Sequence, residues 1–463
     1  MIGIWALAAY LAVILLWTTV FRRSVGEAMI LGFLAVLPFT GAAAAQTGWD
    51  SLYAAITDDI VYATMAFVFM GYLLDRTGVL DRLIDLLNSL IGGVKGGPAW
   101  VSTVASAGLG SVVHNQAAIA ATVGSVTIPW MEKSRLDKPS AATLVAGNAG
   151  MGITFPFSAS MFVLVGSATV GPLLDINALV LPLLFGGLWC FLHRLVVTWL
   201  LVRKSGMAPL NAAHRLPVRA AFGRGWATLL LFVVVAIPLV VTSGAIAEGL
   251  SGWTGADVTK AVSVIVWIPV VLIITGLLLG RKKLPAGSRE WWALLQDSAP
   301  RFGIVGVTVV FAFAGANALA ATGLPRQMTE LLNGMNLPLW LLAILIGLIV
   351  IAVAAPLSAT ATMAAVGTVG VAALVAAGVP ATTAAVAVLV FSSCEAAVPP
   401  GGAPLYVACG IADVDPVTTF LRLFTHYALP LLGIGVLIIL GILPTLRNPP
   451  CTPSEGPSKS SSS

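Results

Sequence analysis

The stretch of sequence that decides the fold occurs twice, as Thr77-Gly78 with Leu86-Leu87-Asn88 and again as Thr322-Gly323 with Leu331-Leu332-Asn333. The internal spacing is the same in both copies. In each copy the stretch opens a short amphipathic segment. A long apolar segment rich in Ala, Gly, Ser and Thr follows, and then an apolar run broken by proline. A repeated pair of interrupted hydrophobic segments is typical of the binding site of a secondary transporter.

The composition places the chain in a membrane. Of its 463 residues, 58% are hydrophobic and 9% are charged, whereas soluble proteins are about 25% charged. Many apolar runs exceed the roughly 20 residues that a helix needs to cross a bilayer. We therefore predict an all-α polytopic membrane protein, because the short alternating segments of a transmembrane barrel are missing from the sequence.

Charge and motifs exclude several other classes of protein. The net charge of +5 is ordinary enrichment of Lys and Arg in cytoplasmic loops, and we expect no nucleic-acid partner. The four cysteines have no metal or redox spacing. The sequence holds no phosphate loop, catalytic triad or metal cluster. We therefore expect a protein that is not an enzyme and that carries no cofactor.

Counting helices and loop charges gives a topology of about ten crossings and two re-entrant hairpins. The hairpins are expected near 98–131 and 338–377, because two apolar arms of about 14 residues reach only about 21 Å each, less than the core thickness of about 30 Å. Broken crossings follow near 139–172 and 380–412. Near the N-terminus, a helix is expected over 25–45 and a loop from Gln46 to Asp59. The loop over 203–224 has five basic residues and no acid, which places it in the cytoplasm and makes the second repeat inverted. We expect six regions: 1–58, N-terminal scaffold helices; 59–175, the first repeat; 176–300, scaffold helices and cytoplasmic loops; 301–415, the second repeat; 416–446, a C-terminal helix; and 447–463, a disordered tail.

Four places put irregular backbone at membrane depth. They are the hairpin tips, residues 111–116 (tip one) and 356–362 (tip two), and the proline-broken runs, residues 148–158 (break one) and 392–402 (break two). Such backbone survives only where it faces protein or a wet cavity, so we expect all four to close on one central site. Amides at broken helix ends suit an anionic substrate, and freed carbonyls suit Na⁺.

The polar residues at these four places are the candidates for binding. The candidate substrate-binding residues are His114, Asn115, Gln116, Thr154, Ser158, Ser358 and Thr360. The candidate ion-binding residues are Asn148, Gly152, Thr362, Ser393, Glu395 and Gly401. Hydroxyl and amide oxygens are hard, neutral ligands, but such groups also bridge helices or bond back to their own carbonyls. The breaks themselves could equally be plain kinks.

Two ionisable residues stand out among the candidates. Glu395 is the acid deepest in an apolar segment of the second half, and such a residue is a functional candidate because burying a carboxylate in lipid is costly. It could take a coupling cation or a proton, cap a broken helix, or pair with a buried base. His114 could bind an anion, sense pH, or hydrogen-bond within its hairpin.

The hairpins and breaks resemble a known family, the large membrane subunit of tripartite ATP-independent periplasmic (TRAP) transporters. The residues that carry the resemblance are Ala120-Ala121-Thr122-Val123-Gly124 through Ile128-Pro129-Trp130-Met131, Ala396 through Gly402, and Leu405 through Ala412, with the closing helix from Phe420 to Pro444. The similarity covers nearly the whole chain in order and length.

The resemblance implies an elevator mechanism, Na⁺ as coupling ion, and an organic-acid substrate such as a dicarboxylate. It also implies a bacterial inner-membrane location, a separate small four-helix subunit and a soluble substrate-binding protein as partners. Two departures bear on the substrate and the ion. The family usually has a Ser- and Gly-rich first tip where this chain has His114-Asn115-Gln116, and a small residue where it has Glu395. The alternative hypothesis is a stand-alone ion-coupled anion permease or a cation/proton antiporter that uses Glu395.

Overall fold

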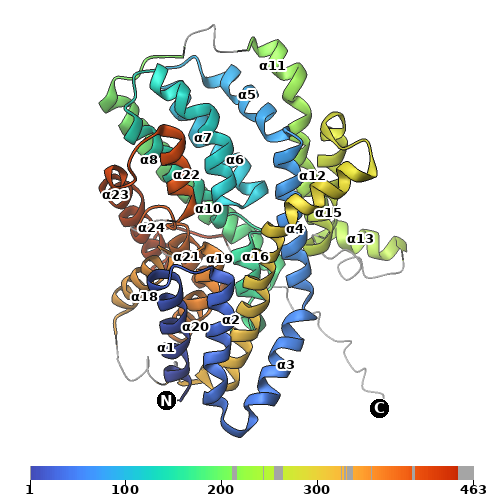
Figure 1. The fold of residues 1–463 in the computed structure, drawn as a ribbon, viewed down its shortest axis with the longest axis vertical. Coiled ribbons are helices and arrows are strands. Elements are labelled where there is room, and N and C mark those ends of the chain that lie inside the picture. The colour runs from blue at the N-terminus through green and yellow to red at the C-terminus, as the bar shows by residue number, and fades with distance from the viewer. Residues whose placement is uncertain are drawn as a thin grey trace, which may run out of the picture.

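A computed structural model gives the fold of the chain. It describes residues 2–210, 216–242, 244–254, 264–324, 326–327, 330, 337–355, 357–398 and 402–446. Every regular element in these ranges is a helix or a helical turn. Figure 1 shows the helices gathered in two groups along the longest axis, with α5 to α8 in the upper part and α18 to α21 in the lower part.

The N-terminal helices form one flank of the molecule. They are α1 (Ile2–Leu15), α2 (Val25–Val36), α3 (Ala44–Ile56) and α4 (Asp59–Arg76), packed on the long helix α16 (Ser288–Ala321). The sequence predicted one helix over 25–45 and then a loop to Asp59, and this was wrong. The chain kinks at Gly41, whose φ of 65° suits glycine, and α3 then forms. Gly48, Ser51 and Ala55 face the protein, while Gln46 and Asp50 bond to each other on the exposed side.

The first repeat matches its predicted order closely. Its elements are α5 (Val79–Ile91), α6 (Gly97–Val113), α7 (Gln116–Lys133), α8 (Lys138–Ala149), a 3-10 turn (Gly150–Thr154) and α9 (Ala159–Val165). The hairpin of α6 and α7 turns at the two residues His114 and Asn115. After α8 the helix is lost until Ser158, because Pro156 lacks the amide that would continue it.

Scaffold helices join the two repeats. They are α10 (Ile176–Ser205), α11 (Val218–Gly225), α12 (Leu230–Val241), α13 (Gly244–Thr254) and α15 (Val264–Gly280). α10 packs along α6 and α21, and so touches the hairpin of one repeat and the broken helix of the other. α11 and α15 pack on α5, and α5 and α11 lie at the upper end of the molecule in Figure 1.

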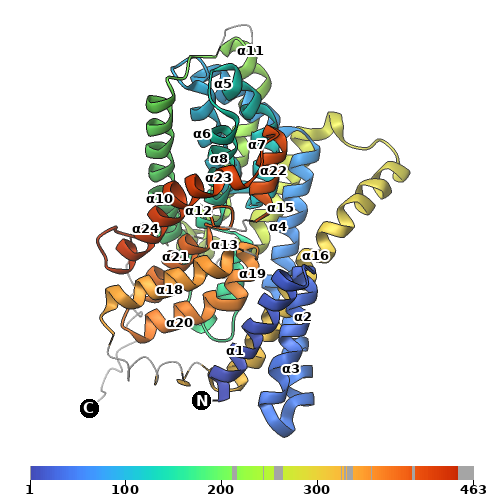
Figure 2. The ribbon, with the colours of Figure 1, turned by 60° about the vertical axis from the view of Figure 1, so that its left-hand side comes forward.

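The second repeat has the same order of elements. They are α18 (Leu339–Ala354), α19 (Ala359–Thr362), a π-helical turn (Met363–Gly367), α20 (Thr368–Ala376), α21 (Ala381–Ser392) and α22 (Ala403–Ala412). The chain then forms α23 (Val417–Leu423), a turn (Phe424–Ala428) and α24 (Leu429–Ile439). α22 packs on α7 and α8 of the first repeat, so the two repeats interlock (Figure 2). The expected amphipathic segment 325–334 and the disordered tail 447–463 lie largely or wholly outside the described residues.

Each of the two Thr-Gly pairs forms the C-terminal end of a helix. The hydroxyls of Thr77 and Thr322 donate to the carbonyls of Leu74 and Leu319, three residues back, at 3.1 and 2.6 Å. Each following glycine has a positive φ, 64° and 77°, which is the conformation that ends a helix.

The two Thr-Gly pairs lie at opposite ends of the molecule, as an inverted repeat requires. Lys283 lies against Gly78 beside α5, whereas Leu324, next to Gly323, packs against Gly3 at the N-terminus. Both views place α5 at the top and the N-terminus near the bottom.

The helices have the length and apolarity of membrane spans. Among the described residues, six helices are long and apolar enough to cross a bilayer, or seven when the bent α16 is included. Five further apolar helices are shorter, and they include α18, α21 and α22 of the second repeat. An all-helical polytopic membrane protein is therefore confirmed, while the exact number of crossings stays a prediction.

Candidate functional site

Glu395, in break two, joins three of the four interrupted places. Its Oε2 atom accepts a hydrogen bond from Nε2 of Gln116, in tip one, at 2.8 Å. The same oxygen accepts a second bond from the backbone amide of Ala359, in tip two, at 3.1 Å. All three groups are buried. One carboxylate therefore holds both hairpin tips against break two.

The position of Glu395 follows from the local backbone. Its own carbonyl accepts from the amide of Gly402 at 2.8 Å, so the two described sides of break two are bonded to each other. The N-terminus of α19 lies opposite Glu395. The Ser358 side chain caps this helix, and the amide of Ala359 remains free to donate to Glu395. A helix N-terminus carries partial positive charge, which suits a carboxylate.

The two breaks meet backbone to backbone. A Cβ atom added at Gly150, in break one, would lie 2.2 Å from the carbonyl oxygen of Ser393 in break two. A Cβ at Gly152 would lie 2.7 Å from the carbonyl oxygen of Gly110 on α6. Only glycine permits these approaches. Close packing against α6 therefore accounts for a glycine at position 152. The carbonyl of Gly152 accepts a hydrogen bond from the amide of Phe155 at 3.4 Å.

His114 connects tip one to break one. It ends α6 with a φ of 53°, and its Nε2 lies 2.7 Å from the carbonyl oxygen of Pro156, while Nδ1 lies 3.1 Å from that of Val112. A neutral imidazole can donate to only one of these carbonyls. With this contact, hydrogen bonds link all four interrupted places, while their closing on one binding site stays a prediction.

Several candidate side chains have local roles in this structure. Asn115, Ser158 and Ser358 accept from the amides three residues ahead and cap α7, α9 and α19. The hydroxyls of Thr154, Thr362 and Ser393 donate to their own helix carbonyls. This is the alternative that the sequence left open for single Ser and Thr residues. Thr360 is half-buried at tip two, and Gly401 lies outside the described residues.

Asn148 belongs to a chain of buried polar groups behind break one. Its Nδ2 donates to the Thr103 hydroxyl on α6 at 3.0 Å, and this hydroxyl lies 2.7 Å from that of Thr198 on α10. Thr198 in turn donates to the carbonyl of Arg194 at 2.8 Å. The chain fixes the broken helix α8 against α10.

The sequence reasoning missed Arg194. This arginine lies in the middle of α10 and is completely buried. Cys190, one turn earlier, lies next to both Arg194 and Thr154 of break one. An arginine within a predicted crossing is a functional candidate by the same rule that singled out Glu395, and applying that rule to 178–201 would have found it.

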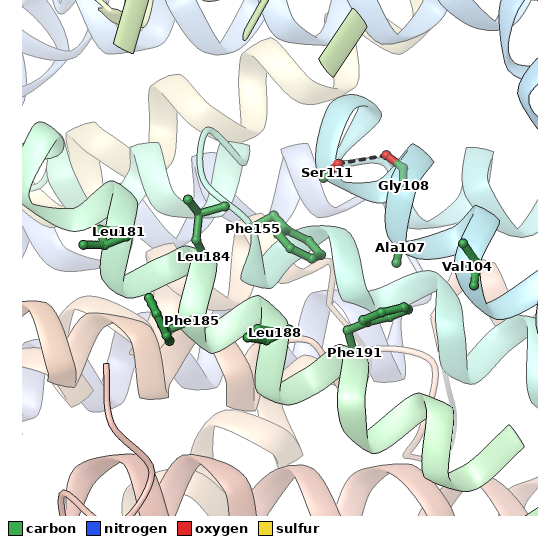
Figure 3. A pocket seen from close by; sticks show the side chains of 10 residues that line it. All are labelled: Val104, Ala107, Gly108, Ser111, Phe155, Leu181, Leu184, Phe185, Leu188 and Phe191. Carbon is green, nitrogen blue, oxygen red and sulfur yellow. Dashed lines mark hydrogen bonds between the residues drawn. The ribbon is translucent and has the colours of Figure 1, made fainter. Parts of the chain in front are cut away.

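A cavity lies outside the site around Glu395. It has a volume of about 490 Å³ and lies between α6 and α10 beside Phe155 of break one (Figure 3). Its walls are almost entirely apolar, and the hydroxyl of Ser111 is turned to the carbonyl of Gly108 at 2.8 Å. This cavity offers little to a polar substrate.

The family of the chain follows from its match to a sequence profile. The profile described as "Tripartite ATP-independent periplasmic transporter, DctM component" matches residues 12–446. The chain belongs to this family. It is thus a TRAP transporter large permease subunit and a multi-pass membrane protein, which confirms the resemblance seen in the hairpins and breaks.

Three relatives show the range of this TRAP family. The C4-dicarboxylate TRAP transporter large permease protein DctM of Rhodobacter capsulatus is 24% identical over 318 residues, 65% of this chain and 67% of that protein. The sialic acid TRAP transporter large permease protein SiaM of Vibrio cholerae is 23% identical over 213 residues, 46% of this chain and 48% of that protein. The ectoine TRAP transporter large permease protein TeaC of Halomonas elongata is 27% identical over 174 residues, 36% of this chain and 40% of that protein. The chain thus spans between about two fifths and two thirds of these relatives.

Two solved structures share the fold of this TRAP subunit. The YdaH transporter of Alcanivorax borkumensis superposes with a TM-score of 0.61 and 14% identity, covering 90% of this chain and 98% of that one. MtrF of Neisseria gonorrhoeae superposes with a TM-score of 0.59 and 13% identity, covering 87% and 83%. At this identity the likeness concerns the architecture alone.

Proposed function

We propose that this chain is the substrate-carrying subunit of a three-part secondary transporter, which imports an organic anion into a bacterium with Na⁺. Its substrate would be a dicarboxylate or another carboxylate. Its partners would be a small four-helix membrane subunit and a soluble substrate-binding protein, with the bacterial inner membrane as the location. The observation that carries the proposal is the hydrogen-bonded junction of both hairpin tips and break two at Glu395.

The geometry supports transport through this junction. The N-terminus of α19 supplies backbone amides where an anion can bind, and Gln116 supplies a side-chain amide. The carbonyl of Ser393, beside Gly150, is a hard oxygen of the kind that Na⁺ prefers. Opening of either hairpin must break a bond to Glu395. In an elevator mechanism, the hairpins and breaks would move together with the substrate past α1–α4 and α16.

Uptake into proteoliposomes tests the proposal. The purified chain is reconstituted with a candidate four-helix subunit and a candidate binding protein, and uptake of labelled succinate and other carboxylates is measured with and without a Na⁺ gradient. We expect uptake to need both the gradient and the binding protein. Uptake that is indifferent to both would refute the three-part, Na⁺-driven system.

The second candidate function is a stand-alone permease or antiporter that uses Glu395 as a proton carrier. It is favoured by one observation, a buried acid that is bonded to both hairpin tips. Glu395→Gln keeps an oxygen acceptor at the same place and removes the titratable group. Uptake is compared across external pH in the two proteins. Parallel pH curves would remove the proton-carrier role, whereas a pH dependence lost in the variant would support it.

A further inference from the structure

Arg194 is a buried cation whose charge the described structure does not neutralise. Its side chain is completely buried, and its Nε and Nη2 atoms make no hydrogen bond to any described residue. Nη1 lies 3.4 Å from Nδ1 of His193, a weak contact. No carboxylate in the described ranges forms an ion pair with it. An arginine cannot lose its proton in a protein, and an unpaired buried charge costs several kcal/mol.

The surroundings of Arg194 reduce this cost without providing a carboxylate; the Cys190 thiol is its hydrogen-bonding neighbour one turn earlier on α10. Its Cζ atom lies 5.7 Å from the ring centroid of Tyr427, a cation–π distance. Cys394, just beyond the C-terminus of α21, lies within electrostatic range, and a helix C-terminus carries about half a negative charge. Nε and Nη2 of Arg194 still have no hydrogen-bond partner among the described residues. The hydroxyl of Tyr427, which is also buried, lacks one too.

Tyr427 places its unpaired hydroxyl in a tight position. A Cβ atom at Gly147 on α8 would lie 2.3 Å from Cζ of the Tyr427 ring, so the ring is pressed on the glycine and cannot turn away. The guanidinium of Arg194 and the hydroxyl of Tyr427, both able to donate hydrogen bonds, thus belong to one buried cluster between α10, α8 and the turn Phe424–Ala428.

A small cavity lies beside this cluster and is lined by Tyr427, but not by Arg194. Its volume is about 60 Å³, and Tyr427, Val197 and Leu201 line it. Val197 and Leu201 lie three and seven positions after Arg194, on the same face of α10. About 10–15 Å³ suffices for a water, so the cavity admits a small ion and excludes a sugar-sized acid. Lys204, Arg422 and His426 line its exposed part. They attract anions, although Asp137 offsets some of this charge by pairing with Arg422 at 2.8 Å.

We propose that Arg194 and Tyr427 form a buried binding site for one small monovalent anionic group. The group is either an inorganic halide or a single carboxylate. Only the carboxylate alternative rests on the proposed transport of an organic acid. Arg194 is buried within this chain alone, so a lipid headgroup or another subunit would reach it only after the helices separated. The site lies behind Thr154 and Cys394, and its occupant would stabilise both breaks.

The test measures thermal unfolding of the purified full-length chain in sodium salts at fixed ionic strength, so that Na⁺ stays constant. Chloride and bromide form one arm, formate and acetate the other, and the bulky buffer anion MES is the reference. We expect a saturable rise in Tm, of about 1–2 °C at ten times the half-saturating concentration. Binding of ³⁶Cl⁻ to the same protein gives an independent measure. A halide response assigns an inorganic ion, and a carboxylate response without a halide response assigns the carboxylate of a substrate.

The variants decide whether Arg194 holds the anion. Arg194→Met should abolish the anion dependence, and Tyr427→Phe should raise the half-saturating concentration about ten-fold by removing one hydrogen bond to a charge. Arg203→Met is the matched control, because Arg203 stacks on Trp199 at 5.3 Å on the same helix but is exposed; its anion dependence should stay unchanged. Equal Tm in all salts for the unaltered protein would overturn the proposal. So would an unchanged anion dependence in Arg194→Met or, should that variant fail to fold, in Tyr427→Phe. None of these results depends on transport, so the proposed function stands or falls separately.

Discussion

The contact between the two breaks predicts a strong effect of one methyl group, in Gly150→Ala. Gly150 has φ −70° and ψ −14°, a conformation that any residue adopts, so the substitution adds a contact and no backbone strain. The new Cβ would lie 2.2 Å from the carbonyl oxygen of Ser393, whereas ordinary contacts begin near 3.4 Å. Break one and break two must therefore part by about 1 Å, and overpacking of this kind costs about 1–3 kcal/mol.

The same displacement should weaken the junction at Glu395. Its bond to Gln116 measures 2.8 Å, and a stretch of about 1 Å takes it beyond hydrogen-bonding distance. We expect Tm in detergent to fall by about 1–3 °C and uptake into proteoliposomes to fall on the order of ten-fold or more, since misplacement of about 1 Å is costly at a binding site.

A matched glycine separates this contact from the general effect of Gly→Ala. Gly433 lies inside α24 with nothing within 4 Å of its added Cβ. Gly433→Ala should therefore be neutral or stabilising by up to about 1 kcal/mol. If Gly150→Ala unfolds at the same temperature as Gly433→Ala and transports normally, the breaks are not held in contact and the reasoning about the site fails.

Three further predictions test other parts of the fold. Burial opposes the charge of Asp137, but hydrogen bonds from Arg422 and the Ser140 side chain and amide outweigh it and lower its pKa. Asp137 therefore stabilises the fold above its ordinary pKa and loses this contribution as pH falls through its lowered value. Asp137→Asn should lower Tm at pH 7, with the gap to the unaltered protein closing in acid; an equal gap at pH 7 and pH 3 would contradict this. Ser158→Ala removes the cap of α9 and should cost about 1 kcal/mol, seen as a lower Tm with uptake retained if the role is only structural. Gly402→Ala would place a Cβ 2.4 Å from Cγ of Glu395 and should lower uptake more than Tm, whereas unchanged uptake would show that this carboxylate can move freely.

The repeat and the hairpins could be predicted because each has a strong local signal. The helix α5 begins and ends where its amphipathic pattern does, at Val79 and Ile91. The hairpin of α6 and α7 turns at His114 and Asn115, where two short apolar arms flank polar residues. Glycine and proline mark both breaks, because they alter the backbone whatever surrounds them.

The roles of individual polar residues could not be predicted in the same way. A serine that caps a helix and a serine that faces a ligand look alike in sequence, and Ser158 and Ser358 are both caps here. The partner of Glu395 was also hidden, since Gln116 lies 279 positions away. Such a contact depends on tertiary packing. The helix over 44–56 was predicted as a loop because it contains several polar residues. Its buried face consists of small residues, which give only a weak apolar pattern.

The two copies share a backbone plan but differ in charge. Break one presents the carbonyl of Pro156 to His114, and break two presents the carboxylate of Glu395 to Gln116 and the α19 amide. The acid on one side of break two and the cation Arg194 behind it are the two buried full charges among the described residues. Each is costly alone, and both lie next to backbone that is already freed from helices. Under the proposed function, this placement would suit ions and substrates that arrive and leave, because the partial charges of the helix ends stabilise either buried charge while its mobile partner is away.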